Sequence, residues 1–295
     1  MEKRFEPVHR PEGWVSASPL PDPEELRAFY ATLYYQHPPS TTYQTEYGEL
    51  ELRYKELRCA ALLHALARAG LEPGGSLLDI GAGEGFLMDA AHRQRHPVIG
   101  LDFSSFAIEK FFGELRDQLI VGDVFDSLAQ LAARGDRFAA CCAINVLEHV
   151  IDPTALLDAV RGVLQPSGVL ALTVPNDFSR LQKLLRDEGR IANQFWFAPP
   201  QHLHYFNAEN LPRFCASRGY KLIDAFSDFP IDLFLMHPGS NYVMDAKNGP
   251  AAHHARMRYD LLIAEAGLES YLAMYRALFN VGVGRNITVI VRPGR

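Results

Sequence analysis

The sequence predicts an α/β protein with a doubly wound, mostly parallel seven-stranded sheet, an N-terminal helical cap and a long C-terminal insertion. From residue 76 onward, short apolar runs alternate regularly with amphipathic segments. Because parallel neighbours must be joined by crossover connections, this alternation is typical of a parallel sheet that helices cover on both faces. The chain has 295 residues, 48% of them hydrophobic, which is enough for one substantial core.

The N-terminal region is predicted to form an extended arm followed by two helices. Residues 1–23 contain five prolines and no hydrophobic periodicity, which favours extended chain. A first helix is expected over residues 22–35. A second is expected over residues 46–69, where apolar side chains recur at helical spacing up to Gly70.

The central part of the chain is predicted to contain five parallel strands and four helices. The strands are expected at residues 76–81, 97–102, 118–123, 137–145 and 168–176. The helices are expected at residues 85–95, 104–116, 126–134 and 153–164. Residues 164–168 contain a proline and a glycine, which predict a helix end and a turn before the fifth strand.

Two later apolar runs, at residues 220–229 and 286–293, are predicted to add an antiparallel strand pair that completes the sheet. The long stretch between them is expected to be mostly helical at residues 256–280. The predicted organisation is an arm and cap, a ligand-binding core, an insertion and a final core strand, at residues 1–70, 71–229, 230–285 and 286–295.

Composition and charge exclude several classes of protein. The net charge is −6, which argues against a dedicated nucleic-acid binder. None of the four cysteines belongs to a C-x-x-C pair, so they are expected to be buried thiols in a reducing compartment. The N-terminus lacks the apolar stretch of a secretory signal, and no run is long enough to span a membrane. We therefore expect a cytoplasmic protein that neither binds nucleic acid nor inserts into a membrane.

A glycine-rich loop, residues 81–85, follows the first predicted strand. Glycines let the backbone approach a ligand closely, and open parallel sheets bind ligands beyond the carboxyl ends of their strands. The loop is one residue too short for the third glycine of the dinucleotide fingerprint, which argues against an NAD-dependent oxidoreductase. Its Glu84 would also repel a pyrophosphate, whereas a ligand with a sulfonium and an ammonium group would tolerate it.

Polar side chains stand at the ends of the first four predicted strands. Asp79 belongs to the first strand, and Asp102 ends the second, where a carboxylate can accept both hydroxyls of a ribose. Asp123 ends the third strand, where it can meet an adenine amino group, and Asn145 ends the fourth. Alternatively, Asp79 caps the following turn and the other two acids are ordinary solvated residues. Four such ends in register favour a nucleoside-type ligand.

The chain resembles the class I S-adenosylmethionine-dependent methyltransferases, in particular the branch of ubiquinone-type O-methyltransferases and sugar-modifying methyltransferases. The resemblance covers about residues 60–176 and rests on the segments LLDIGAGEGF (77–86), GLDFS (100–104), GDVFD (122–126), INVLEHVIDP (144–153) and VLQPSGVLALTVPN (163–176). It implies a Rossmann-like methyltransferase fold whose core, residues 71–229, binds S-adenosylmethionine.

The same resemblance implies roles for individual residues. Gly81 and Gly83 would line the methionine part of the cofactor and Asp102 its ribose. Asp123 and Val124 would line its adenine. The full set of expected cofactor-binding residues is Asp79, Gly81, Ala82, Gly83, Asp102, Phe103, Asp123, Val124, Asn145 and Arg53.

By the same analogy, an N-terminal helix is expected to close over the cofactor. Its candidates for the cofactor carboxylate are Tyr43, Tyr47 and Arg53.

Residues 195–206 resemble the P-x-H-x-x-x-F segment that borders the acceptor pocket in many relatives. His202 and His204 alternate in this stretch, so they are expected to point the same way, and either could remove the acceptor proton. Tyr205 and His149 are expected to shape the pocket. Alternatively, these histidines anchor the loop or cap the next helix. No metal is predicted, because no carboxylate cluster accompanies the His-x-His pair.

The insertion, residues 230–285, is a candidate acceptor lid. Asn241, Tyr242, Arg285 and Asn286 are its expected substrate-binding residues, and they suit a hydroxyl-rich or phosphate-bearing acceptor. The alternative is a packing or dimerisation element, so a homodimer stays open.

The predicted function is transfer of a methyl group from S-adenosylmethionine to a small-molecule acceptor, with a hydroxyl of a sugar or sugar nucleotide favoured. Most of the acceleration is expected from holding the nucleophile in line with the leaving sulfur. The alternatives are O-methylation of a quinone, phenol or polyketide-type acceptor, N-methylation of an amino sugar, and a non-catalytic methyltransferase fold that serves as a binding subunit.

Overall fold

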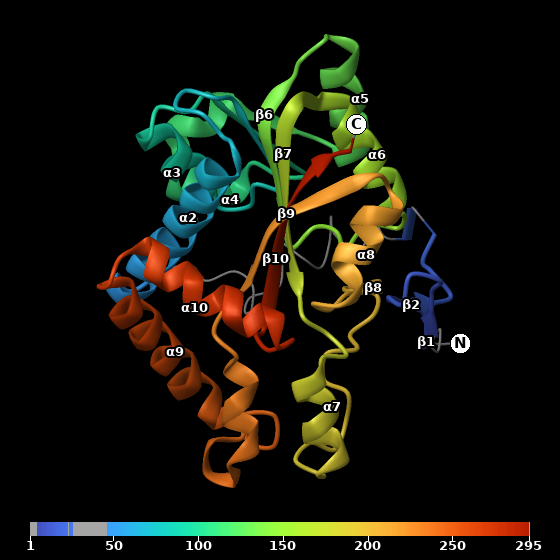
Figure 1. Cartoon of the computed structure of the whole chain (residues 1–295), viewed down its shortest axis with the longest axis vertical. Coiled ribbons are helices and arrows are strands. Elements are labelled where there is room, and N and C mark those ends of the chain that lie inside the picture. The colour runs from blue at the N-terminus through green and yellow to red at the C-terminus, as the bar shows by residue number, and fades with distance from the viewer. Residues whose placement is uncertain (1–4, 23, 26–45, 295) are drawn as a thin grey trace.

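The computed structural model describes residues 5–22, 24–25 and 46–294 and contains two sheets (Figure 1). The large sheet has seven strands in the order β5-β4-β3-β6-β7-β10-β9. The five adjacent strands from β5 to β7 are parallel to one another, whereas β10 runs antiparallel to both β7 and β9. The strands are β3 (Leu77–Ile80), β4 (Val98–Asp102), β5 (Leu119–Val121), β6 (Phe138–Ile144), β7 (Leu164–Pro175), β9 (Tyr220–Ser227) and β10 (Asn286–Pro293). This is the mostly parallel seven-stranded sheet that the sequence predicts.

Helices cover both faces of this sheet, and each face has its own apolar core (Figure 1). One face carries α2 (Glu49–Ala69), α3 (Phe86–Arg93), α4 (Phe106–Phe111) and α10 (Leu268–Asn280). The other carries α5 (Val124–Ala133), α6 (Pro153–Val163) and α8 (Asn210–Ser217). Because side chains alternate along a strand, Cys141 and Cys142 of β6 belong to opposite cores. All four cysteines are free thiols; Cys141, Cys142 and Cys215 are buried as expected, whereas Cys59 is half-buried.

Local sequence signals explain where several helices begin and end. Asp123 caps α5 and Asp152 caps α6, each by accepting two backbone N–H bonds, and Pro153 occupies the first turn of α6. Helix α2 ends at Gly70, whose φ of 114° is readily accessible only to glycine.

The N-terminal arm is extended, as predicted, but it also forms a second sheet. Strands β1 (Glu6–His9) and β2 (Val15–Ser18) make a hairpin, and β2 pairs with the short β8 (His204–Tyr205). The arm thus fixes one of the segments expected to border the acceptor. The helix predicted over residues 22–35 lies mostly outside the described residues, as does Tyr43.

Two local predictions were wrong. The turn predicted at residues 164–168 belongs to β7, which begins at Leu164 opposite Phe138 and continues after a register irregularity. The helix predicted at residues 104–116 is divided into α4 and the 3₁₀ helix η2 (Gly113–Gln118), because Phe112 between them has a non-helical φ of −143°.

The insertion consists of short 3₁₀ turns followed by two helices. These are η3 (Ile231–Met236), η4 (Pro238–Ser240), η5 (Ala246–Asn248), α9 (Gly249–Ala264) and α10. Both α9 and α10 pack against α2, and η3 packs against α7 (Arg180–Asp187) at the lower end of the molecule in Figure 1. In the described parts of the chain, no helix is long and apolar enough to cross a membrane.

Candidate active site

A cavity of about 660 Å³ opens at the carboxyl ends of β3, β4, β5 and β6, a volume typical of small-ligand sites. The glycine loop after β3 forms its floor. Gly81 has a φ of 73°, and a Cβ there would lie 2.5 Å from Cγ2 of Val146. Only glycine therefore lets the loop turn this close to the end of β6.

Three carboxylates of neighbouring strands line this cavity, as the sequence predicts. Asp102 accepts hydrogen bonds from the backbone N–H of Gly83 (2.8 Å) and of Ser104 (3.1 Å), one on each oxygen. Burial, with a smaller contribution from Asp102, raises the pKa of Asp79 to about 7. Asp123 combines its cap of α5 with a place in the cavity wall.

Nine of the ten residues expected to bind the cofactor line the cavity. They are Asp79, Gly81, Ala82, Gly83, Asp102, Phe103, Asp123, Val124 and Asn145. The tenth, Arg53, is exposed on the outer side of α2 and does not reach the cavity. Asn145 has a φ of 54°, a left-handed conformation at the point where β6 enters the site.

Two other cations of α2, Lys55 and Arg58, line the cavity where Arg53 does not. Lys55 forms a 2.8 Å ion pair with Glu84, and the Tyr47 hydroxyl donates a hydrogen bond to the same carboxylate. Arg58 lies four residues after the buried Tyr54 and four before Leu62, on the inward stripe of the helix. This helical phase is the signal that could have identified Arg58.

His149 lines the cavity, and its neighbours fix its tautomer. Its Nδ1 lies 2.7 Å from the carbonyl oxygen of Gln201, which can only accept a hydrogen bond, so Nδ1 carries the proton and Nε2 the lone pair. Burial, followed by the charge of His202, lowers the pKa of His149 to about 3. The imidazole is therefore neutral at neutral pH.

Glu148 and His202 lie beside His149. The Glu148 backbone carbonyl accepts bonds from the N–H groups of Leu203 and His204, which holds this segment against the end of β6. The rings of His149 and His202 are 4.9 Å apart. Among the described residues, neither oxygen of the buried Glu148 side chain nor Nδ1 of His202 has a hydrogen-bond partner.

Glu148, His149 and His202 also form the group of side chains that could hold a metal ion in the described residues. One ligand atom of each lies within 4.8 Å of the others. A carboxylate and two imidazoles suit Zn²⁺, Mn²⁺ or Fe²⁺. The prediction of no metal rested on the lack of a carboxylate near the His-x-His pair, and the fold brings Glu148 to one of those histidines.

The structure does not place His204 and Tyr205 at the cavity. His204 lies between Ser16 Oγ (3.0 Å from Nδ1) and the carbonyl of Ile151 (3.1 Å from Nε2), so both ring nitrogens are occupied by the arm and the loop. The Tyr205 hydroxyl donates to the carbonyl of His202 at 2.7 Å. The expectation that His202 and His204 face one pocket was wrong, because pairing of β8 with β2 directs His204 towards the arm.

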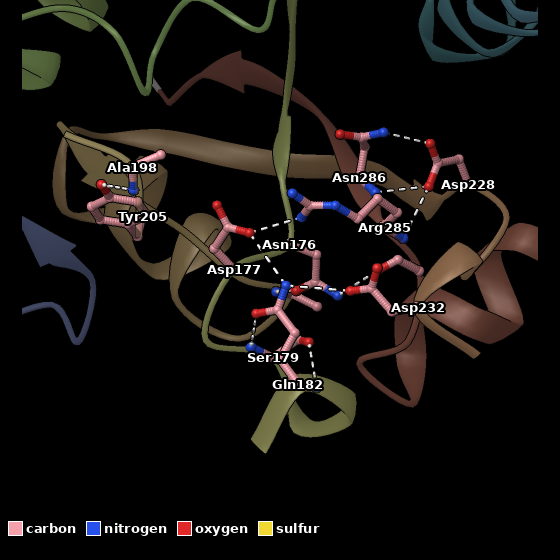
Figure 2. Close-up of polar contacts among 12 residues, drawn as sticks. Asn176, Asp177, Ser179, Gln182, Ala198, Tyr205, Asp228, Asp232, Arg285 and Asn286 are labelled. Carbon is pink, nitrogen blue, oxygen red and sulfur yellow. Dashed lines mark hydrogen bonds and ion pairs between the residues drawn. The ribbon is translucent and has the colours of Figure 1, made fainter. Parts of the chain in front are cut away.

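Three of the four expected substrate-binding residues lie outside the cavity lining and have structural partners. Asn241 donates to two backbone carbonyls and accepts from two N–H groups, and Tyr242 donates to Asp232 at 2.6 Å. Arg285 pairs with Asp177 at 2.7 Å (Figure 2). None of these three lines the cavity, whereas Asn286 does.

Several residues of the cavity wall were not predicted from the sequence. The missed residues, besides Lys55 and Arg58, include Thr173, Ser227, Asp228, Tyr271 and Thr288. Tyr271 is the one residue of the insertion, within its described range, that reaches the cavity. These positions come from strands and helices far apart in the chain, so no local motif marks them.

Comparisons with known proteins agree with this geometry. A family model described as a methyltransferase domain matches residues 52–225. A ubiquinone biosynthesis O-methyltransferase of Cereibacter sphaeroides is 37% identical over 103 residues, which are 34% of this chain and 41% of that protein. Another, from Xanthomonas axonopodis pv. citri, is 33% identical over 124 residues, or 39% of this chain and 52% of that protein. The matches thus span about half or less of these relatives.

Among solved structures, an S-adenosylmethionine-dependent methyltransferase from Archaeoglobus fulgidus has a TM-score of 0.50 to this chain. It is 18% identical, and the match covers 80% of this chain and 93% of that one. At this level of identity the likeness concerns the fold, which is the Rossmann-like methyltransferase fold expected from the sequence.

Proposed function

The chain belongs to the methyltransferase domain family, whose class I members use S-adenosylmethionine as methyl donor, and we propose that it methylates a hydroxyl of a small-molecule acceptor. The observation that carries this proposal is one cavity lined by Asp79, Asp102, Asp123 and His149. Three acids at successive strand ends fit a cofactor with a ribose, an adenine and a cationic methionine part.

Asp102 is the proposed ribose ligand, because Gly83 and Ser104 hold its carboxylate in the cavity wall at the end of β4. Asp123 and Val124 would contact the adenine, and Asp79 would lie near the positively charged methionine part. Lys55, beside the glycine loop, is the proposed partner of the cofactor carboxylate.

His149 is the proposed general base, because it is the expected catalytic residue that lines the cavity. Its neutral Nε2 can take the hydroxyl proton as the acceptor oxygen attacks the methyl carbon and the carbon–sulfur bond breaks. His202 would act through its contact with His149. The rest of the acceleration would come from in-line positioning of the two reactants.

A sugar or sugar nucleotide is our first candidate acceptor. The cavity wall also includes Thr173, Ser227, Asn286 and Thr288. All four side chains already hydrogen-bond within the protein, and their oxygens retain acceptor capacity for the hydroxyls of a polyol. A phenol or quinone precursor is the second candidate, because the curated relatives are named for ubiquinone biosynthesis.

The buried Glu148 oxygens and His202 Nδ1, which lack hydrogen-bond partners among the described residues, favour a second candidate mechanism. Glu148, His149 and His202 could together hold a divalent cation, which would lower the pKa of an acceptor hydroxyl. Metal content of the purified protein and of its Glu148→Gln variant, together with activity before and after chelation, separates the two mechanisms. Activity that persists in metal-free protein supports the base.

The test of the proposed function has two stages. Calorimetry is expected to detect binding of S-adenosylhomocysteine but not of NAD. Mass spectrometry of reactions with S-adenosylmethionine and a panel of sugars, sugar nucleotides and phenols is then expected to reveal a product heavier by one methyl group. NAD binding without S-adenosylhomocysteine binding would contradict the proposal.

A further inference from the structure

We propose that Arg58 anchors an anionic group of the acceptor, a carboxylate or a phosphate, at the end of the cavity remote from the adenosine-binding strands. This inference rests on the proposed function and narrows its substrate class. It concerns a binding residue on α2 that the sequence pattern did not single out.

Arg58 is a cation that faces the cavity. Its side chain is 34% exposed, and it belongs to the cavity lining. The guanidinium also lies over the ring of Tyr54, 5.8 Å from the centroid, which limits its freedom to swing away. Within the part of the chain that the structure describes, Arg58 makes no hydrogen bond. Its N–H groups are thus available to whatever fills the cavity.

The neighbouring carboxylate does not neutralise Arg58 fully. Asp228 Oδ2 lies 3.8 Å from Nη2 of Arg58, which is beyond hydrogen-bonding distance. The Asp228 carboxylate is already engaged by the start of β10, where it accepts from the backbone N–H groups of Arg285 and Asn286 and from Nδ2 of Asn286 at 2.6 Å (Figure 2). The Asp228 carboxylate therefore hydrogen-bonds the start of β10 and only approaches Arg58.

Lys55, one turn earlier on α2, provides the contrast. It is 2.8 Å from Glu84 and lies over the rings of Tyr47 and Phe86, so its partners belong to the glycine loop and its surroundings. Arg58 faces Asp228 at the end of β9 instead. The two cations of one helix thus face different parts of the cavity.

Asp228, the carboxylate nearest to Arg58, follows β9, which lies far across the sheet from the strands that carry the proposed cofactor ligands. In the sheet order, β9 stands four strands from β3, which is roughly 19 Å at the usual strand spacing. The proposed adenosine ligands lie at the end of β4 and just after β5, further still in the other direction. Since Lys55 is the proposed partner of the cofactor carboxylate, an anion on Arg58 would belong to the acceptor. A guanidinium binds carboxylate and phosphate alike through paired N–H bonds.

Matched pairs of small probes test this inference on the whole protein saturated with S-adenosylhomocysteine. Glucose 1-phosphate is compared with glucose, and 4-hydroxybenzoate with its methyl ester, by calorimetry. We expect at least one anion to bind about tenfold more tightly than its neutral counterpart, as a charge-assisted hydrogen bond would give. Which pair shows the preference distinguishes phosphate from carboxylate. Arg58→Gln is expected to abolish the preference, whereas Arg53→Gln, at an exposed position of the same helix outside the cavity, preserves it.

Three results would overturn the inference. The first is the absence of any preference for an anion in the unaltered protein, including weak binding of every probe. The second is a preference that survives in Arg58→Gln. The third is a loss of S-adenosylhomocysteine affinity in Arg58→Gln without loss of anion preference, which would assign Arg58 to the cofactor. Repeating the titrations without S-adenosylhomocysteine separates a failure of cofactor binding, and so of the proposed function, from a failure at Arg58.

Discussion

Arg285 Nη1 donates a 2.7 Å hydrogen bond to Oδ1 of Asp177, and this ion pair joins the end of β7 to the start of β10. The Asp177 side chain is 2% exposed and also accepts from Gln182 of α7. Gln182 in turn contacts Asp232 of the insertion (Figure 2). A residue expected to bind substrate thus holds two core strands, α7 and the insertion together.

Replacement of Arg285 by Ala is expected to destabilise the protein by about 3–5 kcal/mol, because it leaves a buried carboxylate without its counter-charge. Chemical denaturation measures this loss. Arg186→Ala is the matched control, since Arg186 pairs with Asp187 at the surface and its loss should cost less than about 1 kcal/mol. Unchanged stability with a raised acceptor KM would instead support the substrate-binding role predicted from the sequence.

Asp102→Ala is expected to weaken S-adenosylhomocysteine binding by about 1.5–3 kcal/mol, as for loss of a charge-assisted hydrogen bond. The carboxylate also holds the N–H of Gly83, so the loop loses an anchor as well as the ligand. Calorimetry checks the change against Asp117→Ala, an exposed acid outside the cavity. Equal affinities in both variants would remove Asp102 from the cofactor site.

His149 and His204 are expected to respond differently to replacement by Ala. His149→Ala should lower kcat by about 10²–10⁴-fold and spare cofactor affinity, because the proposed base is lost. His204→Ala should lower thermal stability and largely retain kcat, since its ring joins Ser16 to Ile151 away from the cavity. Steady-state kinetics with the acceptor identified by mass spectrometry makes the comparison. Equal kcat in His149→Ala and the unaltered protein would falsify the base.

Asp260 of α9 is expected to make stability depend on pH. Its carboxylate is fully buried and accepts hydrogen bonds from Tyr271 and Tyr275, and burial raises its pKa to about 6. The folded protein therefore binds more protons than the unfolded chain between about pH 4 and pH 6, so the free energy of unfolding falls as pH rises through this range. For Asp260 alone the change is at most about 3 kcal/mol.

Asp260→Asn keeps the shape and removes the titration. Urea denaturation from pH 4.5 to 7.5 should therefore show that the unaltered protein loses stability relative to this variant as pH rises through about 6. Parallel profiles would mean that Asp260 is ionised throughout.

The sequence by itself determined the sheet and the part of the cavity that we propose for the cofactor. The alternation of apolar runs with amphipathic segments predicts parallel strands. The carboxyl ends of parallel strands meet at one edge of the sheet, so acidic residues at these ends must lie close together. Asp79, Asp102 and Asp123 follow from this rule, and so does the glycine loop, where Gly81 meets Val146 too closely for any Cβ.

Only the tertiary structure decided which residues line the rest of the cavity, where we propose that the acceptor binds. Which face of α2 lines the cavity depends on how the helix packs against the sheet. As a result, Lys55 and Arg58 line the cavity and Arg53, which the sequence analysis named, does not. Because β8 pairs with β2, His204 points towards the N-terminal arm and not into the cavity. His202 lies beside Glu148. Arg285 and Asp177 meet across 108 positions of sequence. Such contacts join elements whose spacing in the chain carries no periodic signal, so their geometry arises only when the two cores pack on the finished sheet.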